Sequence, residues 1–274
     1  MTKPGILYIC PTPIGNLEDI TLRVLRVLKE VDIIACEDTR VTQKLLNHYD
    51  IHTKLISYHK FSEKQKSEYI LDLLKQGQNV ALVSDAGTPL ISDPGSELIK
   101  IVTANDIKIE PLPGASAITT ILSASYNESS KFAFVGFLPK NKKEKEELLL
   151  KYSDINTVFY ESPSRIVKTL EEISCILGDR VVTIGRELTK LYEEIKTDRV
   201  SNLIDYYSKN TPKGEIVCII QGETKLISEN ITPEIENQIR ILQNAGYSTK
   251  ELSKILGLLT GISKSKIYDF ALKM

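Results

Sequence analysis

The sequence has no tryptophan, and no apolar stretch in it is long enough to span a bilayer. Its first residues lead into an apolar strand pattern without the core of a signal peptide, so we expect a cytoplasmic protein that does not enter a membrane. The four cysteines are scattered without Cys-x-x-Cys spacing, and each lies in or beside an apolar run. They are therefore expected to be buried free thiols in a reducing compartment.

Neither sign of charge is in excess. The 35 basic and 36 acidic side chains nearly cancel, so the chain as a whole has no field that would draw it to nucleic acid or to a membrane surface. An RNA partner would have to be held by local patches of charge. The length of 274 residues and the hydrophobic content of 42% suit a globular protein with one large or two modest domains.

Metal ligands are scarce as well. His48 and His52 have an i, i+4 spacing, but no third ligand accompanies them in the sequence. Residues 50–51 are expected to lie past the end of a helix, which would separate the two imidazoles. We therefore predict no metal site.

Strand patterns and helix patterns alternate along most of the chain. The expected strands are residues 6–10, 33–36, 54–58, 81–83, 107–112, 132–137, 157–160, 181–184 and 215–220. This alternation predicts an α/β fold with a mostly parallel sheet covered on both sides. The polar segment 127–131 suggests a linker between an N-terminal domain over residues 1–127 and a second α/β domain over residues 128–226. Only helical patterns follow, in a tail over residues 227–274.

The most informative segment is the loop at residues 84–95. It follows an apolar run typical of a strand buried on both faces, and open α/β sheets bind ligands at the carboxyl ends of such strands. Gly87 and Gly95 permit close approach of backbone or a positive φ, and Asp93-Pro94 suits an N-cap and first helical turn. A plain strand-to-helix connection has the same turn chemistry, so this loop alone leaves both interpretations open.

Three further loops at strand ends are rich in polar or small residues. Residues 11–19 combine two prolines with Gly15, residues 37–40 place two carboxylates beside Arg40, and residues 113–117 are small enough to lie against an adenine ring. Surface ion pairing or tight helix packing would explain the last two loops equally well. No Gly-x-Gly-x-x-Gly or Gly-x-x-x-x-Gly-Lys-Ser/Thr pattern occurs, so neither a Rossmann dinucleotide site nor a P-loop is supported.

Taken together, the loops and their neighbours resemble one family over nearly the whole chain. The matching stretches are residues 11–22 (PTPIGNLEDITL), 36–40 (CEDTR), 57–59 (SYH), 81–95 (ALVSDAGTPLISDPG), 113–117 (PGASA), 134–139 (FVGFLP), 159–165 (FYESPSR), 186–194 (RELTKLYEE) and 214–220 (GEIVCII). On these motifs the chain resembles the RsmI group, the bacterial 16S rRNA cytidine 2′-O-ribose methyltransferases of the tetrapyrrole methylase-like superfamily.

The resemblance implies a two-domain, class III S-adenosylmethionine (SAM) methyltransferase fold, with SAM bent in the cleft between the domains. It also implies methylation of a cytidine ribose 2′-hydroxyl in the decoding region of 16S rRNA in the small ribosomal subunit, and a homodimer. By position, it assigns cofactor contacts to Pro11, Pro13, Gly15, Asp85, Thr88, Ile91, Asp93, Ser116, Ala117 and Tyr160.

Roles toward the substrate are expected for charged residues in the matching motifs. Candidates for accepting the hydroxyl proton or orienting the hydroxyl are Glu37, Asp38, His59 and Glu161. Candidates for phosphate contacts are Arg40, Arg165, Arg186 and Lys190. The chain departs from the family pattern at Ser164, where a histidine is usual, and at Lys140, Lys142, Lys143 and Lys145, where the family has arginines.

Two other functions remain open, as does the role of the tail. A methyltransferase acting on a tetrapyrrole intermediate would share the fold and the cofactor, but its first loop should have a Gly-x-Gly-x-Gly-Asp type of sequence. A non-enzymatic ribosome-assembly factor could keep the surface while losing the pocket.

In the tail, a capping box at residues 248–251 and a glycine turn at Gly261 resemble a helix-turn-helix that could bind rRNA. A packing or dimer-supporting role explains the pattern equally well.

Overall fold

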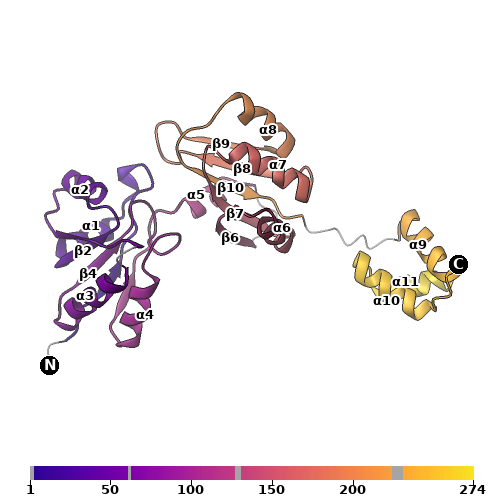
Figure 1. Cartoon of the computed structure of the whole chain (residues 1–274), viewed down its shortest axis with the longest axis horizontal. Coiled ribbons are helices and arrows are strands. Elements are labelled where there is room, and N and C mark those ends of the chain that lie inside the picture. The colour runs from indigo at the N-terminus through magenta and orange to yellow at the C-terminus, as the bar shows by residue number, and fades with distance from the viewer. Residues whose placement is uncertain (1–2, 61–62, 127–130, 224–230) are drawn as a thin grey trace.

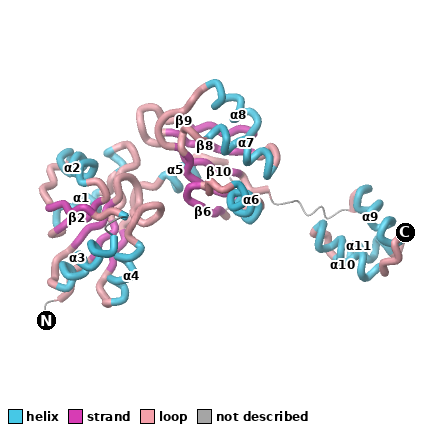
Figure 2. Tube along the Cα trace, in the orientation of Figure 1, coloured by secondary structure: helices cyan, strands magenta, loops and turns pink. Residues whose placement is uncertain are grey.

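The computed structural model describes residues 3–60, 63–126, 131–223 and 231–274, which form two α/β units followed by a unit of helices (Figure 1). Each α/β unit has its own five-stranded sheet. Figure 2 shows the same division, with helices alone in the described C-terminal residues 231–274. The expected α/β class with a helical tail is confirmed. The predicted domain boundaries near residues 127 and 226 lie outside the described residues.

The first sheet is entirely parallel, in the order β3-β2-β4-β1-β5. Its strands are β1 (Leu7–Ile9), β2 (Ile33–Cys36), β3 (Lys54–Ser57), β4 (Val80–Val83) and β5 (Ile109–Pro111). The helices that cover it are α3 (Glu63–Lys75) and α4 (Ser96–Ala104) on one face, and α1 (Leu22–Glu30) and α2 (Thr39–His48) on the other. Leu82 packs toward the first face and its neighbour Ala81 toward the second, which explains why the strand is a continuous apolar run.

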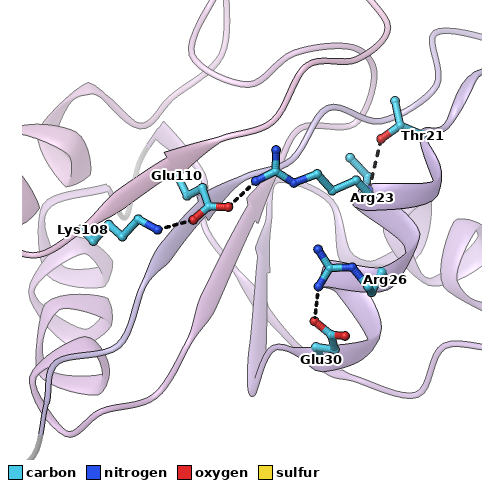
Figure 3. A network of polar contacts seen from close by, with 7 residues as sticks. Thr21, Arg23, Arg26, Glu30, Lys108 and Glu110 are labelled. Carbon is cyan, nitrogen blue, oxygen red and sulfur yellow. Dashed lines mark hydrogen bonds and ion pairs between the residues drawn. The ribbon is translucent and has the colours of Figure 1, made fainter.

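An ion-pair network joins α1 to β5 (Figure 3). Lys108 and Arg23 both donate to the carboxylate of Glu110, and these hydrogen bonds lower the pKa of Glu110. At the start of α1, the hydroxyl of Thr21 accepts the N–H of Val24 at 3.1 Å. Because the two basic side chains are exposed, the network adds less to stability than the core beneath it.

The second sheet is mixed, in the order β6-β7-β10-β8-β9. Its strands are β6 (Phe132–Phe137), β7 (Asn156–Glu161), β8 (Val181–Arg186), β9 (Glu194–Arg199) and β10 (Ile216–Ile220). One face packs against α6 (Lys142–Lys151), α7 (Ile166–Leu177) and α8 (Val200–Lys209), and the other packs against α5 (Ala117–Ser123). The short helix α5 therefore connects the first unit to the sheet of the second.

The prediction of a mostly parallel sheet is wrong for this second unit. Only β6 and β7 are parallel there, and the remaining pairs are antiparallel. β8 and β9 are joined by residues 187–193 without a helix, whereas a parallel pair needs a crossover of about a dozen residues or more. β9 has one aliphatic residue, Ile195, among charged and polar ones, so its sequence carried no hydrophobic strand signal.

Three of the four cysteines are buried as expected, and one is not. Burial raises the pKa of Cys10 to about 12, and it also raises the pKa values of Cys36 and Cys218. These thiols are therefore protonated and unreactive at neutral pH. The prediction is wrong for Cys175, which lies exposed on α7.

The C-terminal unit has its own small core. Its helices are α9 (Pro233–Asn244), α10 (Thr249–Thr260) and α11 (Lys264–Ala271), which pack Ile239, Leu252 and Ile267 together. The predicted capping box is present at Ser248 and Glu251, and Gly261 ends α10 in the left-handed conformation at φ 75°. Across the described residues, no helix is both long enough and apolar enough to cross a membrane.

The start of α4 is capped differently from the prediction. Asp93 and Pro94 were expected to be the N-cap and first turn, but the helix begins at Ser96 and Gly95 is the capping residue, which has no side chain to contribute. Glu63 of α3 supplies the cap instead, because its Oε1 accepts the N–H groups of Gly95 at 2.9 Å and Glu97 at 3.2 Å. The side chain of Asp93 therefore does not cap α4 and remains part of the loop at residues 84–95.

Replacing Glu63 with alanine is expected to destabilise α4. The substitution removes the acceptor of two helix N–H groups, and losing such a cap costs about 1 kcal/mol of folding free energy. Thermal denaturation followed by circular dichroism would measure the effect. Glu68→Ala, at an exposed position of the same helix, is the matched control and should leave the midpoint unchanged. Equal midpoints for the two variants would contradict the assigned cap.

Candidate active site

A cleft of about 470 Å³ lies between the loops of the first unit and the strand ends of the second. The first unit contributes Ile14, Asp85, Ala86, Gly87, Thr88, Ile91, Ser92, Asp93, Ser116 and Ala117. The second unit contributes Phe137, Tyr160, Glu161, Ser162, Pro163, Gly185, Leu188, Gly214, Glu215, Ile216 and Val217. The volume lies within the range of small-molecule sites, and the lining mixes apolar side chains with a few carboxylates.

Hydrogen bonds join the three loops that the first unit contributes. Thr12 and Gly87 exchange backbone hydrogen bonds at 2.9 Å in both directions, and the Thr12 hydroxyl donates to the carbonyl of Ser84 at 3.0 Å. The Thr88 hydroxyl donates to the carbonyl of Ala115 at 3.1 Å. Residues 11–19, 84–95 and 113–117 therefore form one wall whose shape is set before any ligand binds.

Close packing fixes the two units against each other. Ile118 and Ile121 of α5 share a core with Leu188 and Val217 of the second unit. A Cβ on Gly185 would lie only 2.7 Å from Cδ1 of Ile121, so glycine is needed for this approach. The width of the cleft is thus determined by a packed interface.

The cleft is electronegative. Burial raises the pKa values of Asp85 and Asp93, and the negative charge of a neighbouring carboxylate adds to each increase. Burial also raises the pKa of Tyr160, with contributions from Asp93 of the first unit and Glu215 of the second. Carboxylates from both units therefore face the same space, which favours a cationic ligand.

Most of the expected cofactor residues line this cleft. Those that do are Asp85, Thr88, Ile91, Asp93, Ser116, Ala117 and Tyr160. Pro11, Pro13 and Gly15 do not, although Ile14 between them does. Pro11 packs against Gly114, and Gly15 packs against the side chain of Lys190, whose Cγ would lie 2.3 Å from a Cβ at that position.

Glu37 and His59, two of the expected catalytic residues, lie close enough for their charges to interact, and neither lines the cleft itself. Glu37 and Asp93 line the same small recess. Burial raises the pKa of Glu37, the charges of Asp85 and Asp93 raise it further, and the charge of His59 opposes them. Glu37 is therefore a better proton acceptor than an ordinary surface carboxylate, because its pKa is moved toward neutrality.

The other two expected catalytic residues are engaged in structural contacts. Asp38 accepts hydrogen bonds from the backbone and guanidinium of Arg40, which lower its pKa to about 2. Glu161 is buried and accepts from the Thr169 hydroxyl at 2.6 Å and the Ser162 N–H at 2.8 Å, and its Oε1 lies 3.4 Å from Nε of Arg165. A carboxylate with a very low pKa or with its oxygens already occupied is a poor base.

Of the four residues expected to bind phosphate, only Arg40 has a largely exposed side chain, at 86%. Arg165 donates to the carbonyl of Leu138 at 3.2 Å. Arg186 lies 3.5 Å from Glu194, and Lys190 donates to Glu187 and Glu215. These half-buried pairs hold the second unit together around the cleft.

Sequence reasoning missed most of the second unit's contribution to the cleft. Gly185, Leu188 and Val217 lie on or beside β8 and β10, whose antiparallel pairing brings them together. The matching motifs contain Leu188 and Val217 but not Gly185, and nothing in the chemistry of these residues marks them as ligand contacts. Their role follows from the fold.

The described residues contain no group of three or more side chains suited to hold a metal ion. His48 is the last residue of α2 and packs edge-on against Tyr49. His52 lies beyond the helix and pairs with Asp50 at 3.0 Å. The i, i+4 spacing of the two histidines therefore does not place them on one helical face.

Comparison with known proteins gives consistent findings. The family model described as Tetrapyrrole (Corrin/Porphyrin) Methylases matches residues 6–204. The curated protein named ribosomal RNA small subunit methyltransferase I from Halalkalibacterium halodurans is 42% identical over 97% of this chain and 94% of its own length. The proteins of the same name from Bacillus subtilis and Escherichia coli O157:H7 are each 42% identical, over 97% and 98% of this chain and 93% and 95% of their own lengths.

Solved structures share the fold at low sequence identity. A cobalt precorrin-4 methyltransferase, CbiF, aligns with a TM-score of 0.62 at 19% identity, covering 79% of this chain and 94% of that one. A diphthine synthase aligns with a TM-score of 0.62 at 15% identity, covering 80% and 90%.

Proposed function

The chain belongs to the tetrapyrrole methylase family, within the group of ribosomal RNA small subunit methyltransferases I, and on this basis we propose that it methylates the 2′-hydroxyl of a cytidine ribose in the decoding region of 16S rRNA, with SAM as methyl donor. The proposed substrate is the rRNA within the small ribosomal subunit. Such a substrate places the activity in the bacterial cytoplasm. A homodimer is the proposed assembly.

The lining of the cleft fits SAM. When bound, SAM supplies a methyl group that is already activated by its sulfonium charge. Asp85, Asp93 and Glu215 offer carboxylates to the positive charges of the ligand, while Ile14 and Leu188 offer apolar contact to its adenosine. The backbone of the loop at residues 84–95 is held in place by hydrogen bonds, which lowers the entropic cost of binding.

The main catalytic task of the protein is to orient the ribose hydroxyl. Correct orientation can lower the activation free energy by about 7–11 kcal/mol. A general base has a smaller effect, since it increases the rate about 100- to 10,000-fold. We assign the role of proton acceptor to Glu37, because its raised pKa and its place beside Asp93 suit it better than Asp38 or Glu161. Asp38 then acts as a support, since its N–H donates to Asp85 at 3.0 Å.

The observation that carries this proposal is the preformed acidic cleft in a chain that matches its relatives over almost its full length. The first loop, PTPIGN, lacks the Gly-x-Gly-x-Gly-Asp pattern expected of a tetrapyrrole methyltransferase, which favours an rRNA substrate over a tetrapyrrole. The retained pocket argues against a non-enzymatic assembly factor.

Two assays on the full chain separate these functions. Calorimetric titration with SAM should give saturable binding at one site per chain, and an absence of binding would favour the assembly factor. Transfer of radiolabelled methyl from SAM should then be compared for small ribosomal subunits and for a uroporphyrinogen. We expect labelling of the subunits only. Labelling of the tetrapyrrole instead would replace the proposed substrate.

The affinity for SAM is expected to fall as the pH is lowered from neutral. Glu37, Asp85 and Asp93 have raised pKa values, chiefly through burial, so they take up protons at a higher pH than ordinary carboxyl groups and lose their attraction for a cation. Because their folded-state pKa values lie above the unfolded values, the same protonation stabilises the fold as the pH falls through this window. Calorimetry at a series of pH values would measure the affinity, and an unchanged affinity on acidification would contradict the electrostatic assignment.

A further inference from the structure

One exposed aromatic side chain lies at the rim of the cleft. Phe137, the last residue of β6, is 57% exposed and still contributes to the lining. Its ring lies 5.6 Å from that of Tyr160, and the ring of Phe134 lies 5.1 Å from Tyr160 as well. Aromatic side chains are common in the lining of ligand sites, where their rings offer a flat apolar surface.

A bulge in β6 turns Phe137 toward the cleft. In a regular strand, Phe134 and Phe137 are an odd number of residues apart and would face opposite sides of the sheet. Here the pairing register shifts between them, and Gly136 adopts a φ of +68°. Both rings therefore contact Tyr160 on the same face. Bulges that redirect a side chain are common next to active sites.

Lysines follow directly on this aromatic residue. Lys140 lies between β6 and α6, and Lys142 and Lys143 are the first two residues of α6. Within the described part of the chain, Lys140 and Lys142 have no carboxylate within ion-pair distance, and Lys143 reaches Glu147 only at 4.0 Å. The side chain of Asn141 accepts the N–H groups of Lys143 and Glu144, so these backbone donors are not free to bind an anion. The groups of this segment that can bind an anion are therefore the lysine ammonium groups.

The segment that carries these residues is held rigidly. Arg165 donates to the carbonyl of Leu138 at 3.2 Å while its Nε lies 3.4 Å from the buried carboxylate of Glu161. Leu138 itself is buried in the core of the second unit. A ring on such a support can receive a planar ligand with little loss of conformational entropy.

We infer that Phe137 with Lys140, Lys142 and Lys143 binds the single-stranded RNA next to the target nucleotide. An unstacked base lies on the ring of Phe137, and the adjoining phosphates lie against the three ammonium groups. Aromatic rings beside exposed lysines match the chemistry of single-stranded RNA, whose bases are free to stack. The identity of the RNA rests on the proposed function. Because the net charge of the chain is −1, RNA must be bound by a local patch of charge such as this one.

The lysines are tested by the salt dependence of binding. The triple variant Lys140→Gln, Lys142→Gln, Lys143→Gln should bind a fluorescein-labelled single-stranded RNA of decoding-region sequence more weakly. Its slope of log affinity against log salt should be smaller by about 2, from a contribution of about 0.7 per phosphate contact. Lys64→Gln, Lys75→Gln, Lys100→Gln is the matched control on α3 and α4, which contribute nothing to the described cleft lining. Equal slopes for the two triple variants would overturn the phosphate contacts.

The ring is tested by paired substitutions. Phe137→Ala should weaken RNA binding and raise the KM for small subunits about tenfold, whereas Phe137→Tyr should retain wild-type values because it keeps the stacking surface. A change confined to the affinity for SAM, or no change, would overturn the stacking role. If RNA binding depends on these residues but subunits are not methylated, the RNA-binding surface is supported and the proposed function is refuted. If subunits are methylated equally well by the wild type and the variants, the proposed function is supported and the RNA-binding surface is refuted.

Discussion

Gly95→Ala is expected to destabilise the first unit by about 2–6 kcal/mol. Gly95 has a φ of +139°, a conformation that costs a residue with a Cβ of order 1–3 kcal/mol. The added Cβ would also lie 2.3 Å from Cδ2 of Leu90 and 3.2 Å from Cδ2 of the buried Leu82, and overpacking of this kind costs about 1–3 kcal/mol more. Because Gly95 ends the loop at residues 84–95, SAM affinity should fall as well.

Thermal denaturation of the purified variant would test this expectation. Gly246→Ala is the matched control, since Gly246 has a φ of +87° and its added Cβ would meet no heavy atom of the described residues within 4 Å. The control should lose only about 1–2 kcal/mol, the cost of a left-handed conformation for an L-residue. Similar losses in both variants would mean that packing at Gly95 is not the constraint.

Asp93→Asn is expected to weaken SAM binding about 10- to 100-fold, the effect of losing a charge-assisted interaction worth about 1.5–3 kcal/mol. The substitution keeps the shape of the side chain but removes a partly buried negative charge from the cleft. It should also bring the pKa of Tyr160 closer to its ordinary value, because Asp93 contributes to the increase.

Calorimetric titration with SAM gives the first readout, and an ultraviolet pH titration of tyrosine ionisation gives the second. Asp72→Asn, an exposed carboxylate on α3, is the control and should match the wild type in both. If Asp93→Asn bound SAM as tightly as the control, the cleft would not use this carboxylate to hold the cation.

The sequence predicted the first unit well because its information is local. The strand at residues 81–83 is apolar on both faces, and the turn residues after it mark the loop that forms the cleft wall. The N-cap of α4 could not be predicted in the same way. It comes from Glu63, 32 residues before Gly95, and such a contact depends on the packing of α3 against α4.

The second unit was predicted less well because more of its structure depends on contacts between residues that are far apart in the sequence. The charged sequence of β9 has no apolar alternation, and the antiparallel direction of β8 and β10 follows from their connections. Residue type alone also does not show how charged groups are paired. Arg165, Arg186 and Lys190 have the chemistry of phosphate ligands, but the structure pairs each of them with a carboxylate of the same unit.

The residues expected to bind the cofactor were easier to place at the cleft from the sequence than those expected to act on the substrate. The residues expected to bind the cofactor lie in glycine-rich or small-residue loops whose conformation is locally constrained, and Asp85, Thr88 and Ser116 all line the cleft. The ability of a carboxylate to act as a base depends on its neighbours in space. Glu37 and Asp38 are adjacent in sequence, yet the pKa of the first is raised and that of the second is lowered.

Mapping the methyl group on the RNA would show directly whether the protein methylates the proposed ribose. Small ribosomal subunits that lack the modification would be incubated with SAM and the full chain, and their rRNA would then be cleaved with alkali, which spares bonds beside a 2′-O-methylated ribose. We expect a single new protected position at a cytidine of the decoding region, dependent on both SAM and the chain. Protection elsewhere, a methyl group on a base, or no new protected position would contradict it.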